Sequence, residues 1–188
     1  MLRTALLLVM LGGTLSSAQP VSLFKEVGHA PRHWGNMRIG VDSSTVRPEL
    51  CLELSPIELA SIEACGTGSG FLHHDPAPEI AHFRTKLKLM SWETPIGFLQ
   101  PRLGLGFAEL QIGEDTAGFY FASAGPTGVE TSGPEAGLSL RCLTPVIAGF
   151  ELVAELNFSA AVFAYAPKLV RPQAVVQPTL SISVGFGF

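Results

Sequence analysis

The chain has 188 residues, of which 47% are hydrophobic and only 15% are charged, and its formal net charge is −4 at pH 7. This mildly acidic balance gives no reason to expect a nucleic-acid partner, which requires a basic surface. After the N-terminal region no apolar run has the roughly 20 residues of a membrane-spanning helix, which excludes that class of membrane protein. The 20 glycines and 14 prolines are typical of many turns between short strands.

The first 18 residues have the pattern of a secretory signal peptide. Arg3 supplies a basic start, residues 5–11 are an apolar run, and Ser16 and Ala18 place small residues before a cleavage site. We therefore predict that residues 1–18 are removed on export and that residues 19–188 form one domain. The residue directly after the predicted cleavage site is Gln19 and not a cysteine, so a lipid anchor is not expected.

Eight segments alternate apolar with small or polar residues, which is the period of a β-strand. The first is the weakest, because Lys25 falls among its apolar residues. The third changes phase at Pro56, where we expect a bulge. The predicted strands cover residues 21–28, 37–42, 50–59, 83–89, 99–107, 138–142, 150–159 and 179–188.

The last strand shows the alternation most clearly and ends the sequence on an aromatic residue. One face is large and apolar, with Leu180, Ile182, Val184, Phe186 and Phe188. This strand resembles the terminal strand of bacterial outer-membrane β-barrels, whose assembly machinery reads a C-terminal aromatic residue. The resemblance implies that Phe188 and Phe186 are a membrane-assembly signal, and that outer-membrane lipid and the barrel-assembly machinery are partners.

Long and short connections alternate between the predicted strands. Short turns are expected at 43–48, 94–97 and 144–149, and long loops at 61–80, 112–134 and 161–175. If the C-terminus is periplasmic, the order of eight strands puts every short turn on that side and every long loop outside, as in outer-membrane barrels. The fold we predict is therefore an all-β, eight-stranded antiparallel transmembrane up-and-down barrel, in the outer membrane of a Gram-negative-type bacterium.

Charged residues of both signs fall on the face opposite the large apolar residues. An eight-stranded barrel is only wide enough for side chains to fill its interior, so we expect an ion-pair network rather than a pore. This predicts a structural or surface-interaction role without a cofactor, and no enzymatic activity. The expected interior charges are Arg38, Asp42, Glu53, Arg84, Lys86, Lys88, Arg102, Arg141, Glu151 and Glu155.

Two clusters of metal-ligating residues lie in the predicted outer loops. Imidazole and carboxylate groups together suit a divalent metal such as zinc, provided that both loops are ordered and meet. Solvated loop histidines are the simpler interpretation. The candidates are His29, His33, His73, His74 and Asp75.

In size, signal peptide and strand count the chain also resembles the outer-membrane lipid A deacylases. That resemblance implies a His-x-Ser-Asn motif in which His activates Ser for attack on a lipid ester. The matching strand, Leu156-Asn-Phe-Ser-Ala-Ala161, offers Ser159 without the histidine. A lipid-modifying enzyme with a non-standard site at Ser159 is thus an alternative function, and an inward polar residue is the simpler interpretation.

Two further questions stay open at this level. A secreted soluble barrel of lipocalin type would show the same alternation with an apolar ligand inside and the charges outside. The three cysteines, Cys51, Cys65 and Cys142, allow at most one internal disulfide. Pairing Cys51 with Cys65 would tie a predicted strand to a predicted loop, and Cys142 is expected on the lipid face.

Overall fold

The computed structural model describes residues 25–26, 34–45, 47–68, 72, 76–113, 118–147 and 149–188. The predicted signal peptide lies outside this part of the chain. Within it, no helix is long and apolar enough to cross a membrane. The described residues form β-strands, joined by turns and by one short 3₁₀ helix, Ala166–Lys168.

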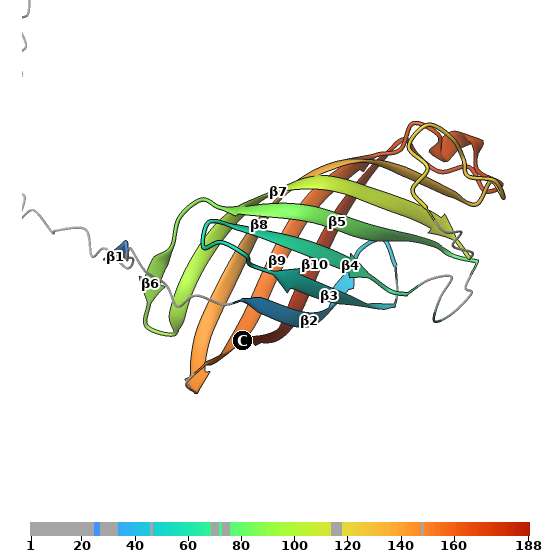
Figure 1. Ribbon diagram of the computed structural model, residues 1–188. Coiled ribbons are helices and arrows are strands. Elements are labelled where there is room, and N and C mark those ends of the chain that lie inside the picture. The colour runs from blue at the N-terminus through green and yellow to red at the C-terminus, as the bar shows by residue number, and fades with distance from the viewer. Residues whose placement is uncertain are drawn as a thin grey trace, which may run out of the picture.

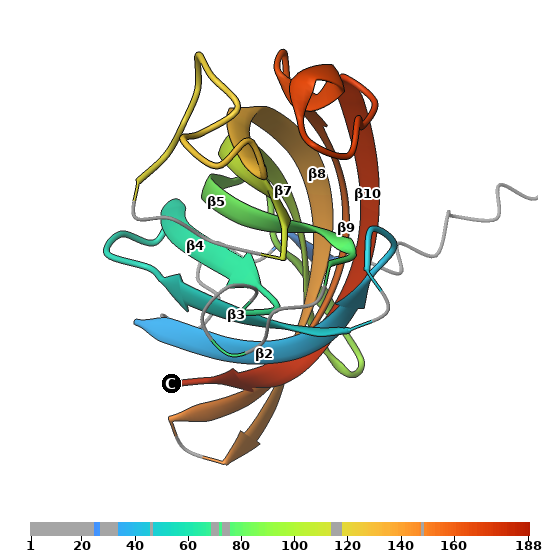
Figure 2. The same cartoon turned by 90° about the vertical axis from the view of Figure 1, so that its right-hand side faces the viewer.

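Eight of the described strands close into an antiparallel barrel (Figure 1 and Figure 2). Each pairs with the next barrel strand in the chain, and the last pairs with the first to close the ring. The prediction of an eight-stranded antiparallel β-barrel is confirmed. The barrel strands are β2 (Gly35–Asp42), β3 (Pro48–Leu54), β4 (Ala60–Gly66), β5 (Pro78–Lys88), β7 (Gly97–Ile112), β8 (Glu130–Ile147), β9 (Phe150–Val162) and β10 (Val176–Gly187).

Three of the sequence assignments are wrong. Of the predicted strand 21–28 the structure describes only β1 (Lys25–Glu26), which pairs with the short β6 (Trp92–Thr94) outside the ring. The eighth barrel strand is instead β4, where a loop is predicted. Its outward residues are Ala60, Ile62, Ala64 and Gly66, and only Ile62 is large and apolar, so β4 shows a weaker apolar face than the other strands. The phase change at Pro56 is the turn between β3 and β4, not a bulge.

The two ends of the barrel carry different connections (Figure 1). The C-terminal end, where Phe188 donates its backbone N–H to the carbonyl of Gly35, holds the turns 55–59, 89–96 and 148–149. The opposite end, called the long-loop end here, holds the connections 43–47, 67–77, 113–129 and 163–175. Strands β7, β8 and β9 are longer than β2, β3 and β4, so the wall is higher on one side.

The predicted sorting of the connections is correct in part. The turns at 94–97 and 144–149 lie at the C-terminal end, but the turn predicted at 43–48 lies at the long-loop end. The misassigned first strand shifts the strand count by one, which reverses the side of that turn. The long loops are also shorter than predicted, because strands extend into the segments 61–80, 112–134 and 161–175.

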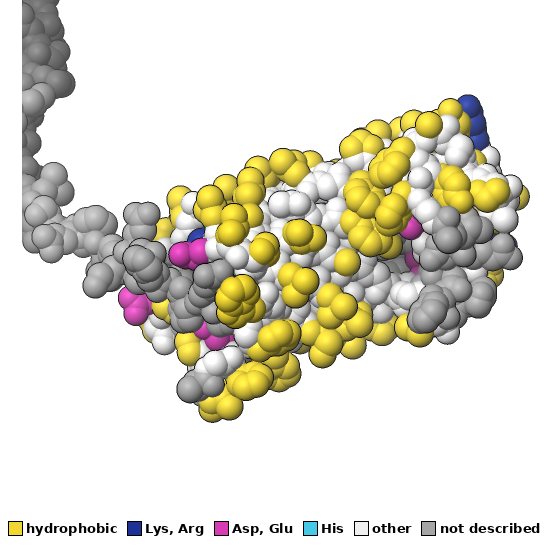
Figure 3. All heavy atoms as spheres, in the orientation of Figure 1, with side chains coloured by type: hydrophobic (Ala, Val, Ile, Leu, Met, Phe, Trp, Pro, Cys, Tyr) yellow, Lys and Arg dark blue, Asp and Glu magenta, His cyan; other side chains and the backbone are white. Residues whose placement is uncertain are grey.

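Over most of the wall the strands turn large apolar side chains outward and charged or small polar ones inward. Leu156, Leu180 and Ile182 are 48%, 51% and 56% exposed, whereas Glu155 and Ser181 are 3% and 6% exposed. Figure 3 shows apolar side chains spread along the outside of the barrel. The lipocalin-type alternative requires an apolar interior and a charged exterior, which is the opposite arrangement.

At the long-loop end of β7 the inward residues become apolar and the outward residues become polar. There the inward residues Ala108 and Leu110 pack in an apolar cluster with Phe163 and other residues of the 163–175 connection. The alternate residues Glu109 and Gln111 are polar, and Gln111 Nε2 donates to Glu109 Oε2 at 3.2 Å. At this level the inside is apolar, and the outward polar residues of β7 are buried, with Glu109 4% and Gln111 6% exposed.

An aromatic cluster marks the level at which the facing reverses. Phe83 of β5 and Phe107 of β7 stack on the outer wall with ring centroids 5.0 Å apart. Phe119 folds back from the 113–129 connection onto both rings, at 5.1 and 4.8 Å. Phe121, in the same connection, also contacts the Phe107 ring, at 5.3 Å.

A disulfide joins β3 to β4 inside the barrel. Cys51 and Cys65 are register partners with Cα atoms 4.1 Å apart, and both are buried. The expectation that this pairing ties a strand to a loop is wrong, because residue 65 belongs to β4. Cys142 is a free thiol of intermediate exposure on β8.

Thiol counting tests this covalent link. The denatured chain should react with one equivalent of a thiol reagent before reduction and with three after it, since only Cys142 is free. The double substitution Cys51→Ala/Cys65→Ala should lower the free energy of unfolding by about 2–4 kcal/mol, because it frees the unfolded chain. Cys142→Ala is the control and should change it little. Three reactive thiols in the unreduced chain would contradict the pairing.

Candidate functional site: the charged interior of the barrel

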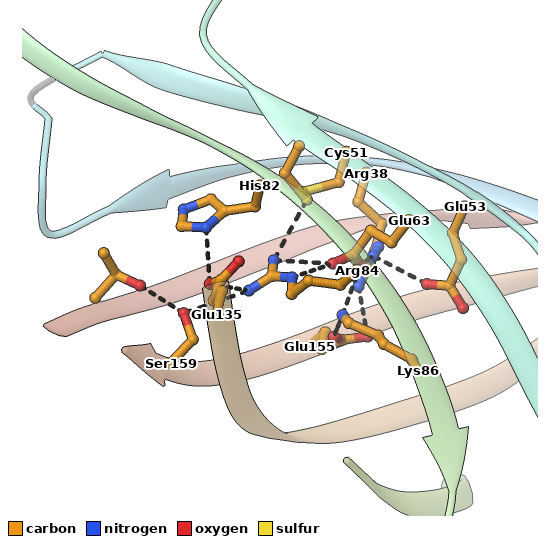
Figure 4. A network of polar contacts seen from close by, with 12 residues as sticks. Arg38, Cys51, Glu53, Glu63, His82, Arg84, Lys86, Glu135, Glu155 and Ser159 are labelled. Atoms are coloured by element: carbon orange, nitrogen blue, oxygen red, sulfur yellow. Dashed lines mark hydrogen bonds and ion pairs between the residues drawn. A yellow bond between two sulfur atoms is a disulfide. The ribbon is translucent and has the colours of Figure 1, made fainter. Parts of the chain in front are cut away.

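The middle of the barrel is filled by buried ions of opposite sign. They come from seven of the eight barrel strands, and Figure 4 shows several of them converging from opposite walls. Among the described residues, five cations contact four carboxylates: Arg38, Arg84, Lys86, Arg102 and Arg141 on one side, and Glu53, Glu63, Glu135 and Glu155 on the other.

Glu63 of β4 shows how closely the charges are matched. Its Oε1 accepts from Arg84 Nη2 at 2.8 Å and its Oε2 accepts from Lys86 Nζ at 2.6 Å. The Arg38 guanidinium donates to the same carboxylate. One buried anion thus compensates three cations from two other strands, and its removal would leave them with an excess of positive charge.

Arg141 of β8 plays the reciprocal part for two carboxylates. Its Nη1 donates to Glu53 Oε1 at 2.8 Å, and its Nε donates to Glu155 Oε2 at 2.6 Å. Arg102 also reaches Glu53 Oε1, at 2.9 Å, and donates to Ser61 and Gln100. These contacts cross the lumen, because β3 and β8 are not neighbours in the sheet.

Nearly all of the charges that the sequence assigns to the interior are buried there. The exception is Lys88, which lies at the rim of the C-terminal end, where its Nζ donates to Glu58 at 2.7 Å. Asp42 lies at the long-loop end of β2 and Glu151 near the C-terminal end of β9. The buried members of the predicted set are Arg38, Asp42, Glu53, Arg84, Lys86, Arg102, Arg141, Glu151 and Glu155.

Sequence reasoning missed four interior residues that contact or adjoin this set: Glu49, Glu63, His82 and Glu135. Glu63 lies in the strand that was taken for a loop. His82 and Glu135 lie just outside the predicted strands 83–89 and 138–142. Only an extension of the period-two pattern beyond the large apolar residues would have found them.

Ser159 lies inside the barrel, and no imidazole of the described residues contacts it. Its hydroxyl forms a 2.7 Å hydrogen bond with Thr179 Oγ1 and lies 3.4 Å from Arg84 Nη1. The described residues include one histidine that could act as a base, His82, but its Nδ1 is hydrogen-bonded to Glu135 Oε1 (Figure 4). The geometry is that of a polar residue in the interior network.

A second group of titratable residues lies above the network, toward the long-loop end. His82 Nδ1 is 2.9 Å from Glu135 Oε1, and His82 Nε2 faces Asp42 Oδ2 at 3.9 Å. Glu49 lies beside them, with one carboxylate oxygen inside the same group. These side chains come from β2, β3, β5 and β8.

The predicted loop metal ligands, His29, His33, His73, His74 and Asp75, lie outside the described residues. The strand β2 that follows the first pair begins at the C-terminal end of the barrel, at Gly35. The segment with the other three connects β4 to β5 at the long-loop end. That metal site stays a prediction.

Two solved structures of small bacterial outer-membrane β-barrels are similar in fold. The N-terminal β-barrel domain of Pseudomonas aeruginosa OprF matches with a TM-score of 0.42 and 10% identity, covering 82% of this chain and 95% of that chain. Ail, the attachment invasion locus protein of Yersinia pestis, matches with a TM-score of 0.37 and 12% identity, covering 81% and 92%. No protein-family model and no curated protein matches the sequence.

A substitution at Glu63 measures how much the buried network contributes to the free energy of unfolding. Glu63→Gln should lower the free energy of unfolding by about 3–5 kcal/mol, because it leaves buried cations without their shared anion. Glu58→Gln is the matched control: its carboxylate also pairs with a lysine but is 48% exposed, so the cost should stay below about 1 kcal/mol. Urea unfolding of the chain in detergent gives both values. Equal, small costs would contradict the role of Glu63.

Proposed function

We propose that the chain is an integral β-barrel of a bacterial outer membrane with a structural or surface-interaction role. The observation that carries the proposal is the facing of the wall, apolar outside and ionic inside. Water would make the exposed belt of leucine, isoleucine, valine and phenylalanine unfavourable, because apolar surface of that extent drives association. Lipid makes it favourable, since alternate residues of each strand then face hydrocarbon.

The reversal of facing at Phe83 and Phe107 supports a membrane boundary at that level. Below it the outer wall is apolar; above it the outward residues of β7, Glu109 and Gln111, are polar and buried, and an apolar cluster fills the inside. Aromatic residues gather at the edges of the apolar band in membrane barrels. The long-loop end is then the outer surface, and the C-terminal end is periplasmic.

The interior network supports a barrel that does not conduct. Charged side chains from opposite walls meet in the lumen of an eight-stranded barrel, which leaves no room for an aqueous channel. The connections 67–77, 113–129 and 163–175 at the long-loop end are the surface we propose for interactions outside the cell.

Phe186 and Phe188 support assembly through the route that the terminal strand implies. Both side chains lie on the outer wall, 59% and 55% exposed, in a strand that closes the barrel. We propose outer-membrane lipid and the barrel-assembly machinery as partners on this basis. Neither role requires a cofactor.

Cell fractionation tests the location. The chain should remain in the outer-membrane fraction after carbonate washing, and its electrophoretic mobility in SDS should change when the sample is boiled, because a closed barrel resists SDS. A soluble control protein exported to the periplasm should be released. Recovery of the chain in the soluble fraction would contradict the proposal.

A single outward residue separates the lipid and water settings. Ile182 lies in β10 between Leu156 and Val41, all three facing outward. In lipid, Ile182→Lys should destabilise the barrel by about 2–4 kcal/mol and reduce its assembly. Ile182→Val is the control and should assemble normally. In water the lysine would be tolerated or favourable, so an unchanged or improved yield of folded Ile182→Lys would contradict the membrane assignment.

A further inference from the structure

Two groups of three acidic or imidazole side chains converge inside the barrel, and they differ in how they are compensated. Glu53, Glu63 and Glu155 are close together, but arginines donate to each of them. Lys86 also donates to Glu63 and Glu155. Those cations already supply the positive charge that three adjacent carboxylates require. This lower group has no need of a metal ion.

The upper group, Asp42, Glu49 and His82, is compensated far less. Its ligand atoms also lie within 4.8 Å of one another. Among the described residues, Asp42 Oδ2 and Glu49 Oε1 have no hydrogen-bond partner, although Asp42 is 6% and Glu49 2% exposed. A buried carboxylate oxygen without a partner carries a large desolvation cost, which a bound cation removes.

His82 is oriented as a metal ligand rather than as a donor to these carboxylates. Its Nδ1 is hydrogen-bonded to Glu135 Oε1 at 2.9 Å, which favours the tautomer with the proton on Nδ1. The Nε2 lone pair then faces Asp42 Oδ2 at 3.9 Å, beyond hydrogen-bond distance. A carboxylate that holds the far nitrogen of a ligating histidine is the usual outer shell of a zinc site.

Glu49 also borders a cavity at the long-loop end of the barrel. The cavity measures about 700 Å³ and is lined by Glu49, by outward-facing residues such as Leu50, and by Gly68, Leu72 and Phe119 of the loops. Asp42 and His82 do not line it. The neighbouring Cys51 and Cys65 lie close to Glu49 but are joined to each other, so their sulfurs are not ligands.

We propose that Asp42, Glu49 and His82 bind one divalent transition-metal ion of the Zn²⁺ class inside the long-loop end of the barrel. Imidazole with carboxylates favours such an ion over Mg²⁺ or Ca²⁺, which prefer oxygen ligands alone. Bonds of about 2.0–2.2 Å would draw the three ligand atoms together by small side-chain rotations. Three protein ligands leave a fourth position for water. The site depends on the interior arrangement and not on the membrane setting.

Calorimetric titration of Zn²⁺ tests the site. The full-length chain, purified in detergent and freed of metal with a chelator, should bind Zn²⁺, and His82→Gln should abolish one bound ion per chain. Glu135→Gln should weaken the affinity about 10- to 100-fold, because it loosens the histidine without removing a ligand. Circular dichroism checks that each variant keeps its β-sheet content.

Glu58→Gln is the control, because it removes an exposed carboxylate at the C-terminal end without touching the proposed ligands. It should bind as the unchanged chain does. If His82→Gln does not fold, Glu49→Gln replaces it, since that carboxylate oxygen has no partner to lose. Absence of Zn²⁺ binding, binding that persists in the folded His82→Gln or Glu49→Gln variant, or an equal loss of binding in Glu58→Gln would each overturn the proposal.

Discussion

The structure depends on one electrostatic constraint: a charge inside the barrel must meet an opposite charge. An uncompensated buried ion costs several kcal/mol. Glu53, Glu63 and Glu155 avoid that cost because cations from strands that are not their neighbours in the sheet reach them. A slip of one residue in any of these strands would turn its charges to the outer wall. The network therefore specifies the register of the barrel as well as filling it.

The same strands serve two environments along their length. In β7, Arg102 points into the ionic interior, whereas Leu110 at the same parity points into an apolar cluster near the long-loop end. The inward side chains of β7 are therefore charged at the level of the ionic network and apolar at the level of the apolar cluster. The lumen is therefore ionic along most of its length and closed by the apolar cluster toward the long-loop end. The group of His82, Asp42 and Glu49 lies between the two.

Compensation also separates the two groups of converging carboxylates. The carboxylates of the lower group are paired with arginines and a lysine, and these ion pairs connect strands inside the barrel. The upper one, with Asp42 and Glu49, retains buried oxygens without partners in the described part of the chain. The proposed metal site therefore lies at the long-loop end, next to the connections proposed as the interaction surface.

Much of the fold was predictable because alternation of side chains is a local property. Each residue's face follows from its neighbours in a strand, so the paired faces of β8, β9 and β10, and the inward direction of Arg141 and Glu155, can be read directly. The errors arose where the local signal fails. The small residues of β4 hide a strand, and one misplaced strand is enough to put the 43–48 turn at the wrong end.

The sequence by itself determined seven of the eight barrel strands, each with one apolar face and one charged or small polar face. It could not determine which charges meet, because Glu63, His82 and Glu135 are far apart in the chain and come together only through closure of the ring. Nor does a sequence show whether a given carboxylate is compensated. That property depends on the cations that other strands bring within about 4 Å, and only the tertiary structure places them.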